Sequence, residues 1–391
     1  MDQGTATDYS MPTHFESSPL PPPRPNPVSS HPSHARGSGL DDTEARISAP
    51  VLAASAGLRK AMLVPVVTAL VIGTIFVAVY LAAFHAPGAR HEPLGIAAPN
   101  AVAATTELAL NNSAPSAFTF YRYADEAAAR QAIDHDEVPA VLVDDGAGMR
   151  LLVAGAQGPS TVSALSAAVT GAVGHQVPVD DVLPLAPGDA RGLSVFYSAF
   201  GVVLAGFLFA MASYQMAPRL PLIARMASMS VFAVASGILI ALIAHTGFAA
   251  LPAPFGMVAL LVGLLAWASA AGTGVLLRIF GPLGVSVASI VMLILGNATS
   301  GGILPTTFLP GWLSPLAQML PPAAAVSGLR GAAYFHDANL ANALLTLIIW
   351  IVGCSALQFV LDRVAARRQL RASVPVPVSA PVPMPVPAVQ G

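Results

Sequence analysis

The hydrophobic residues of this chain gather in long runs that contain no Asp, Glu, Lys or Arg. A helix needs roughly 20 apolar residues to cross about 30 Å of hydrocarbon, because each residue adds about 1.5 Å. Six runs meet this requirement, at approximately Ala61 to Phe84, Leu193 to Gln215, Met226 to Ala249, Pro252 to Leu277, Phe280 to Ala298 and Leu340 to Leu361. The pattern predicts an α-helical integral membrane protein with six transmembrane helices.

The composition agrees with this prediction. Hydrophobic residues make up 55% of the chain and charged residues 10%, whereas soluble domains are about a quarter charged. The net charge of −2 shows no basic excess, so nucleic acid is not an expected partner. Cys354 is the single cysteine, and it cannot form an intramolecular disulfide.

The two ends of the chain differ from the apolar runs. Residues 1–55 are rich in Pro, Ser, Gly and His and show no apolar periodicity, which predicts a disordered leader. The leader also places the first apolar run too far from the terminus for a cleaved signal peptide. The tail 373–391 repeats Val and Pro and favours extended polyproline II geometry. We expect a solvated, disordered tail, with a ligand for an SH3-like partner as the alternative.

Arginines and lysines near the ends of the runs predict the orientation, because short translocated loops are depleted in them. They all fall on one side if the chain crosses six times: Arg59, Lys60, Arg219, Arg225, Arg278, Arg363, Arg367, Arg368 and Arg371. This side is expected to be the cytoplasm, so both termini are cytoplasmic and the protein is multi-pass in the plasma (inner) membrane. Arg90, Arg191 and Arg330 are exceptions to the rule, and the first two belong to a loop long enough to translocate as a domain. Arg278 is expected to extend to the cytoplasmic headgroups.

Residues 86–192, between the first two runs, predict a small extracytoplasmic α/β domain. The loop holds 12 Asp or Glu against 5 Arg, as suits a domain that meets water. Strands are predicted at Leu94 to Ala98, Phe118 to Tyr123, Val138 to Val143 and Met149 to Ala154. Helices are predicted at Asp125 to Asp134 and Ser160 to Val173.

The remainder, 193–361, is predicted to form a five-helix transmembrane domain interrupted before the last run. Five prolines and several glycines between residues 296 and 333 exclude a regular spanning helix. Irregular backbone at membrane depth is tolerated only beside protein or a water-filled cavity, so residues 299–333 are expected to form a re-entrant or interfacial segment. Its candidate transport residues are Asn297, Ser300, Gly301, Gly302, Pro305, Pro310, Trp312 and Arg330.

Several motifs are shared with a known family. The order of a basic-flanked first span, an α/β domain and five further spans is accompanied by NATSGGILP, LPGW, LPP and GLRG before the last span. The α/β domain carries AIDHDEVPAVLV at Ala132 to Val143. Over roughly residues 55–370 the chain resembles type 2 ABC-transporter permeases, in the branch of phage-infection-protein-like (Pip-like) membrane proteins.

The resemblance implies the membrane half of an exporter, energised by a separate ATP-binding subunit, and a homodimer, since related permeases work as dimers. The sequence agrees in having no G-x-x-x-x-G-K-[ST] loop to hold ATP. Many permeases of the wider group are coupled through a clear amphipathic N-terminal helix. Arg46 to Lys60 is only weakly amphipathic here, which departs from that pattern.

Chemical sites are weakly indicated. No Asp or Glu lies in the six runs, which argues against a proton-coupled antiporter. Asn297, Thr299 and Ser300 could bind a polar substrate group, although capping and turn formation are commoner uses, and His245 is expected at a helix end. The group Asp134 to Glu137 could suggest a metal, but consecutive residues diverge, and a solvated helix end is favoured. No catalytic constellation appears, so neither an enzyme nor a cofactor is expected.

Two functions remain open. The first is a permease subunit of an ABC-type exporter for a lipophilic or amphiphilic substrate. The second is a non-transporting membrane receptor or scaffold, in which the extracytoplasmic domain binds a partner and the spans only anchor it. A neighbouring ATPase would favour the first.

Overall fold

The computed structural model describes the backbone of residues 40–86, 88–146 and 148–372. The predictions for residues 1–39 and for the tail 373–391 lie outside the described residues. The chain divides into two compact units, Met1–Leu63 and Val64–Gly391. Helix α1 (Leu40–Phe84) begins in the first unit and continues into the second. It starts earlier than the boundary expected near residue 55, because Ala, Leu, Glu and Arg in this stretch are good helix formers.

Within the described residues, five helical stretches are long and apolar enough to cross a membrane. They are Ala61–Phe84, Ser194–Met216, Leu222–Gly247, Phe255–Ala298 and Leu340–Gln369. The corresponding elements are α1, α5 (Ser194–Met216), α6 (Leu222–Ala241) with the π-helical turn η2 (Leu242–Gly247), the stretch that begins with α7 (Phe255–Phe280), and α12 (Leu340–Ala372). The molecule is therefore compatible with a helical multi-pass membrane protein.

The fourth stretch unites the fourth and fifth predicted runs. It covers 44 residues, and a straight helix of that length would extend about 66 Å, roughly twice the hydrocarbon thickness. The helix is interrupted at Gly281, whose φ is +57°. A Cβ atom added at Gly284 would lie 2.5 Å from the carbonyl oxygen of Leu276, so the chain folds back against α7. It continues as η3 (Gly281–Leu283), α8 (Gly284–Ala288), the π-helical segment η4 (Ser289–Leu295) and α9 (Gly296–Ala298).

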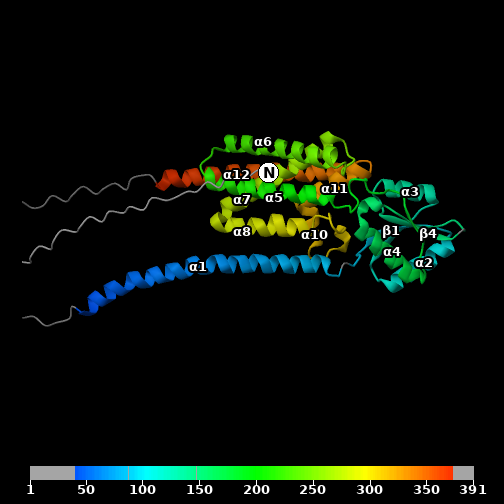
Figure 1. Ribbon diagram of the computed structural model, residues 1–391, viewed down its shortest axis with the longest axis horizontal. Coiled ribbons are helices and arrows are strands. Elements are labelled where there is room, and N and C mark those ends of the chain that lie inside the picture. Colours follow the sequence, from blue (N-terminus) through cyan, green and yellow to red (C-terminus); the bar gives the residue numbers. More distant parts are fainter. Residues whose placement is uncertain (1–39, 87, 147, 373–391) are drawn as a thin grey trace, which may run out of the picture. The chain divides into compact units, whose positions relative to one another are not determined.

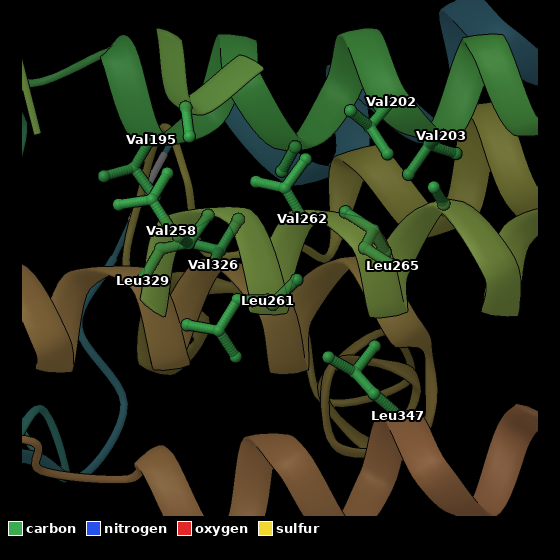
Figure 2. Packing of buried hydrophobic residues seen from close by; sticks show 14 of the residues in the cluster. Val195, Val202, Val203, Val258, Leu261, Val262, Leu265, Val326, Leu329 and Leu347 are labelled. Carbon is green, nitrogen blue, oxygen red and sulfur yellow. The ribbon is translucent and has the colours of Figure 1, made fainter. Parts of the chain in front are cut away.

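Helix α7 forms the centre of the helical core. Valines and leucines from α5, α7, α11 and α12 converge around it, as Figure 2 shows for Val195, Val202, Val203, Val258, Leu261, Val262, Leu265, Val326, Leu329 and Leu347. Small residues bring the helices close: a Cβ added at Gly237 of α6 would lie 2.2 Å from the carbonyl oxygen of Ala259. Such close approach is typical of packing between helices in a membrane, where small residues replace hydrophobic burial as the means of association.

The proline-rich segment before α12 forms short pieces of helix. They are η5 (Thr306–Phe308), α10 (Ser314–Met319) and α11 (Pro321–Tyr334). Helix α11 has 14 residues and extends about 21 Å, too short to cross the hydrocarbon. Its side chains Val326 and Leu329 belong to the α7 core. The structure thus has short helices and loops here instead of a regular spanning helix, as the prolines predict.

The predicted α/β fold of the domain between α1 and α5 is confirmed. Five strands form one sheet in the order β2-β1-β3-β4-β5, in which only the β3–β4 pair is antiparallel. The strands are β1 (Glu92–Ala97), β2 (Phe118–Arg122), β3 (Ala140–Asp144), β4 (Met149–Val153) and β5 (Val179–Asp181). The helices are α2 (Asn100–Ser113), α3 (Glu126–Asp134) and α4 (Pro159–Val173), preceded by the short η1 (Gly155–Gln157). Helix α2 and strand β5 escaped the sequence analysis.

Helices cover both faces of this sheet (Figure 1). Leu142 of β3 points to the face covered by α2 and α4, and Val141 and Val143 point to the face covered by α3. Phe335, from the connection between α11 and α12, is fully buried in the α3 face. The domain core therefore includes a residue from the helical part of the chain, which ties the domain to the segment before the last span.

Candidate functional site

The polar residues at the end of η4 are buried. A π-helical turn inside a membrane helix is rare and often accompanies a functional site, and η4 leads directly into Asn297, whose exposed fraction is 3%. The Nδ2 atom of Asn297 forms no hydrogen bond of good geometry among the described residues, although the side chain interacts with the Tyr80 hydroxyl. A poorly paired amide donor in an apolar interior is costly, so a polar group that comes from outside the chain would stabilise this position.

A cavity of about 520 Å³ lies beside η4. Helix α1 forms one wall, and η4 and Phe200 of α5 form the other. The lining is almost entirely apolar: Ala69, Ile72, Gly73, Phe76, Tyr80, Phe200, Ser289, Leu293 and Ile294. Its size and chemistry suit a lipophilic molecule.

The cavity ends near the Asn297 amide. The hydroxyl of Tyr80 is within hydrogen-bonding reach of the Asn297 side chain. Val79 and Ala298 pack together at this level, and Leu295 continues the apolar contacts toward Leu309. The arrangement combines an apolar volume with a polar end, which is the pattern that an amphiphilic molecule requires.

Gly301 and Gly302, which follow η4, are required by two different features of the local structure. Gly301 has a φ of +74°, in the left-handed region that glycine tolerates best. A Cβ atom at Gly302 would lie 2.7 Å from the Phe196 ring. The hydroxyl of Ser300 donates to the carbonyl oxygen of Asn297 at 2.8 Å and accepts from the Gly302 N–H at 3.2 Å. Ser300 therefore stabilises the turn, which is the structural role weighed against substrate binding.

Residues at and just before the start of β1 in the α/β domain form hydrogen bonds with the loop around η5. Arg90 donates from Nη1 to the carbonyl oxygens of Phe308 and Leu309, at 3.1 and 2.8 Å. The hydroxyl of Thr307 donates to the Glu92 carboxylate. A cavity of about 400 Å³ at this junction is lined in part by Arg90, Thr307 and Leu309. The segment is thus bonded to the domain at residues separated by more than 200 positions in the sequence.

Glu92 is a buried carboxylate at this junction. Its exposed fraction is 3%, and loss of hydration raises its pKa to about 7, while the hydrogen bond from Thr307 acts in the opposite direction. The negative charge of Asp136 raises the pKa further. Near neutral pH, Glu92 is consequently divided between its protonated and ionised forms.

Arg330 of α11 approaches the same junction from the other side. Its Nη1 donates to the carbonyl oxygen of Gly301 at 3.2 Å, and its charge interacts with those of Asp136 and Asp189. Loss of hydration raises the pKa of Asp136 to about 6, against the opposing effects of Arg330 and of hydrogen bonds from Gln157 and Asn339. The carboxylates of Asp136 and Asp189 therefore compensate the positive charge of Arg330, which was an exception to the predicted distribution of basic residues.

The remaining candidate residues are dispersed. Pro305 and Pro310 are partly buried in the loops around η5, whereas Trp312 is 59% exposed. The interpretation of Asp134 to Glu137 as a solvated helix end needs correction at Asp136, which lies in the left-handed region at φ +59° and bonds Gln157 and Asn339. Within the part of the chain that the structure describes, no three His, Cys, Asp or Glu side chains form a group that could hold a metal.

Arg278, expected to extend to the headgroups, is paired instead. Its Nε lies 3.2 Å from Asp362 Oδ1, and Arg225 Nη1 lies 3.0 Å from Oδ2 of the same carboxylate. Asp362 directly follows the last predicted run and belongs to the apolar stretch of α12. The charge pattern of the sequence singled out Arg225 and Arg278 as basic residues near the ends of apolar runs. Only the packing of α6, α7 and α12 shows that both pair with Asp362.

Residues that sequence reasoning missed include Tyr80, Arg90 and Glu92, whereas Asp136 was considered only as part of a solvated helix end. The three missed residues follow no recognisable motif, and the roles of all four depend on contacts with residues distant in the chain. Comparison with known protein families, with curated protein sequences and with solved structures finds no match.

Proposed function

We propose that this chain is the membrane permease subunit of an ABC-type exporter for a lipophilic or amphiphilic substrate, energised by an ATPase on a separate chain. The observation that carries the proposal is the apolar cavity between α1, α5 and η4, which has the Tyr80 hydroxyl in its lining and the Asn297 amide next to that hydroxyl. A cavity of this chemistry offers a site that a lipophilic molecule could enter from the bilayer.

The proposal includes six membrane crossings. The fold-back at Gly281 divides the fourth apolar stretch into α7 and a returning half that ends at Ala298. With six crossings the α/β domain lies outside the plasma membrane, both termini are cytoplasmic, and the basic residues near the span ends share the cytoplasmic side. The homodimer is likewise part of the proposal, and it rests on the resemblance alone.

Filling the cavity tests the proposal. Gly73 lines it, and no described atom lies within 4 Å of the Cβ that a substitution would add. Gly73→Phe, with open space at its Cβ, should therefore fill part of the cavity and reduce export. Gly201→Phe on α5 is the matched control, because Gly201 is exposed, has the same free space and does not line the cavity.

Efflux of a lipophilic dye should be measured in cells that hold equal amounts of each protein in the membrane. We expect lower efflux for Gly73→Phe and unchanged efflux for Gly201→Phe. Equal efflux from both variants and the unmodified protein would contradict a transport role for the cavity. Co-purification of a nucleotide-binding subunit from detergent would test the energy source separately.

A receptor or scaffold is the second candidate, favoured by one feature of the α/β domain. Helices α2 and α4 border a surface cavity of about 420 Å³, which is lined in part by Val102, Ala109 and Val173. A partner could dock there without any transport. Partner binding to the intact chain, combined with efflux that never exceeds the level of cells lacking the protein, would support this alternative.

A further inference from the structure

The end of the helical bundle that carries Asp362 has an excess of positive charge. One carboxylate is shared by Arg225 and Arg278, and Arg219 and Arg363 are exposed beside it. Four guanidinium groups against one carboxylate leave three positive charges in and around this cluster. Because both oxygens of Asp362 already contact arginines, its charge is largely compensated by its neighbours.

A cavity of about 450 Å³ opens at this cluster. Its walls come from the α5–α6 connection and from the last turns of α12: Pro218, Arg219, Leu220, Pro221, Leu222, Arg225, Phe359, Asp362, Arg363, Ala365, Ala366 and Gln369. Arg225 is 4% exposed and is oriented by bonds to the Leu220 carbonyl oxygen and to Asp362. The guanidinium of Arg363 lies 4.8 Å from the centre of the Phe359 ring.

The N-terminus of α6 faces the same cavity. Pro221 and Leu222 belong to its lining, and no described side chain caps this helix of 20 residues. The first N–H groups of a helix lack intrahelical partners and carry a partial positive charge, so they bind phosphate oxygens well. Arginine side chains supply the same chemistry through paired hydrogen bonds.

Exposed apolar residues lie close in sequence to residues that line this cavity. Met216, at the end of α5, is 86% exposed, and Ile223, in the first turn of α6, is 85% exposed. A soluble phosphate would make no use of them, whereas the acyl chains attached to a phosphate headgroup would cover them. A basic pocket between membrane helices with apolar residues at its edge is typical of recognition of an anionic lipid.

We propose that this cavity binds the phosphate group of an anionic phospholipid. Arg219, Arg363 and the N-terminus of α6 contact the phosphate, and Arg225 supports the site from beneath through Asp362. The acyl chains lie against Met216 and Ile223. This site requires that the helices lie in a bilayer, but it does not depend on transport, so failure of the exporter proposal would leave it standing.

The test uses the purified full chain in detergent and measures lipid binding by native mass spectrometry. Phosphatidylglycerol and phosphatidylcholine of equal chain length are the probes. Arg219→Gln with Arg363→Gln removes two exposed cavity charges and leaves the Arg225–Asp362–Arg278 cluster intact. Arg367→Gln with Arg368→Gln is the matched control, because these substitutions at exposed positions remove the same charge from α12, the helix of Arg363, outside the cavity.

We expect the unmodified chain to prefer phosphatidylglycerol, and the cavity variant to lose about thirtyfold in affinity, at about 1 kcal/mol for each of the two arginines. The control variant should lose less than about threefold. Equal losses in both variants, or no preference between the two lipids, would overturn the site. Inorganic phosphate that binds as tightly as phosphatidylglycerol would overturn the assignment to a lipid. Restored affinity in Arg219→Lys with Arg363→Lys would support a charge-based contact and exclude misfolding as the cause of the loss.

Discussion

Arg330 joins the α/β domain to the turn that follows η4. Its guanidinium bonds the Gly301 carbonyl oxygen at 3.2 Å while its charge interacts with Asp136 and Asp189. One side chain thus links the glycine turn, the short helix α11 and two carboxylates of the domain region. These contacts explain why an arginine occupies position 330, although it does not fit the predicted distribution of basic residues.

Replacing this cation should destabilise the junction. Arg330→Gln removes the positive charge that compensates Asp136 and Asp189, and we expect a loss of about 1–3 kcal/mol in the free energy of unfolding. The midpoint of thermal unfolding in detergent measures this loss, with Arg330→Lys as the control that keeps the charge. The loss should be smaller at pH 5 than at pH 8, because Asp136, with a pKa of about 6, is then mostly protonated. If Arg330→Gln and the unmodified protein unfolded at the same midpoint at pH 8, the positive charge of Arg330 would not be needed for stability.

Glu92 predicts that stability falls as the pH rises. Its pKa is about 7 in the folded protein, above the ordinary 4.5, so the folded state holds this proton more tightly than the unfolded state does. The resulting stabilisation is complete below about pH 4.5 and is lost as the pH rises through about 7, with an upper limit of about 3 kcal/mol. Unfolding midpoints should decline between pH 5 and pH 8, and less steeply in Glu92→Gln. Glu137→Gln, at an exposed position, is the control. If the unfolding midpoint of Glu92→Gln declined with pH as steeply as that of the unmodified protein, Glu92 would not be the cause of the pH dependence.

The glycine turn predicts a selective loss of export. In Gly301→Val with Gly302→Val, one valine must adopt a left-handed backbone and the other meets the Phe196 ring. We expect reduced dye efflux with the protein still inserted in the membrane. Gly311→Val is the matched control, because Gly311 lies in the same segment with free space around its Cβ. Disappearance of the double variant from the membrane would indicate instead that the turn is needed for folding, and full efflux would contradict a role in transport.

The arrangement of six crossings predicts which surfaces face the outside of the cell. In a background without Cys354, cysteines introduced at the exposed positions Ser160 and Thr246 should react with a membrane-impermeant thiol reagent in intact cells. A cysteine at Gln369, exposed in α12, should react only after the membrane is broken. The opposite labelling pattern would reverse the orientation, and labelling of Ser160→Cys without Thr246→Cys would change the number of crossings between them.

Local patterns were sufficient for the long apolar helices and for most of the α/β domain. The length of an uncharged run is set by the bilayer, so the helices α1, α5, α6 and α12 could be located without tertiary information. Strands β1 to β4 were found for a similar reason, since their apolar residues are consecutive and bounded by turn residues. Helix α2 and strand β5 were missed because α2 contains many polar residues and β5 has only three residues, all exposed.

The sequence by itself determined where the chain is apolar enough for a membrane and where prolines break its helices. Only the tertiary structure decided what the charged and buried polar residues do. Glu92 meets Thr307, Arg330 approaches Asp136, and Asp362 is shared by Arg225 and Arg278. These partners come from separate helices and from a separate domain, and periodicity along the chain records only the face on which each residue lies. Their pairing depends on how those elements pack, which in turn depends on contacts such as Gly237 with Ala259 and the fold-back at Gly281.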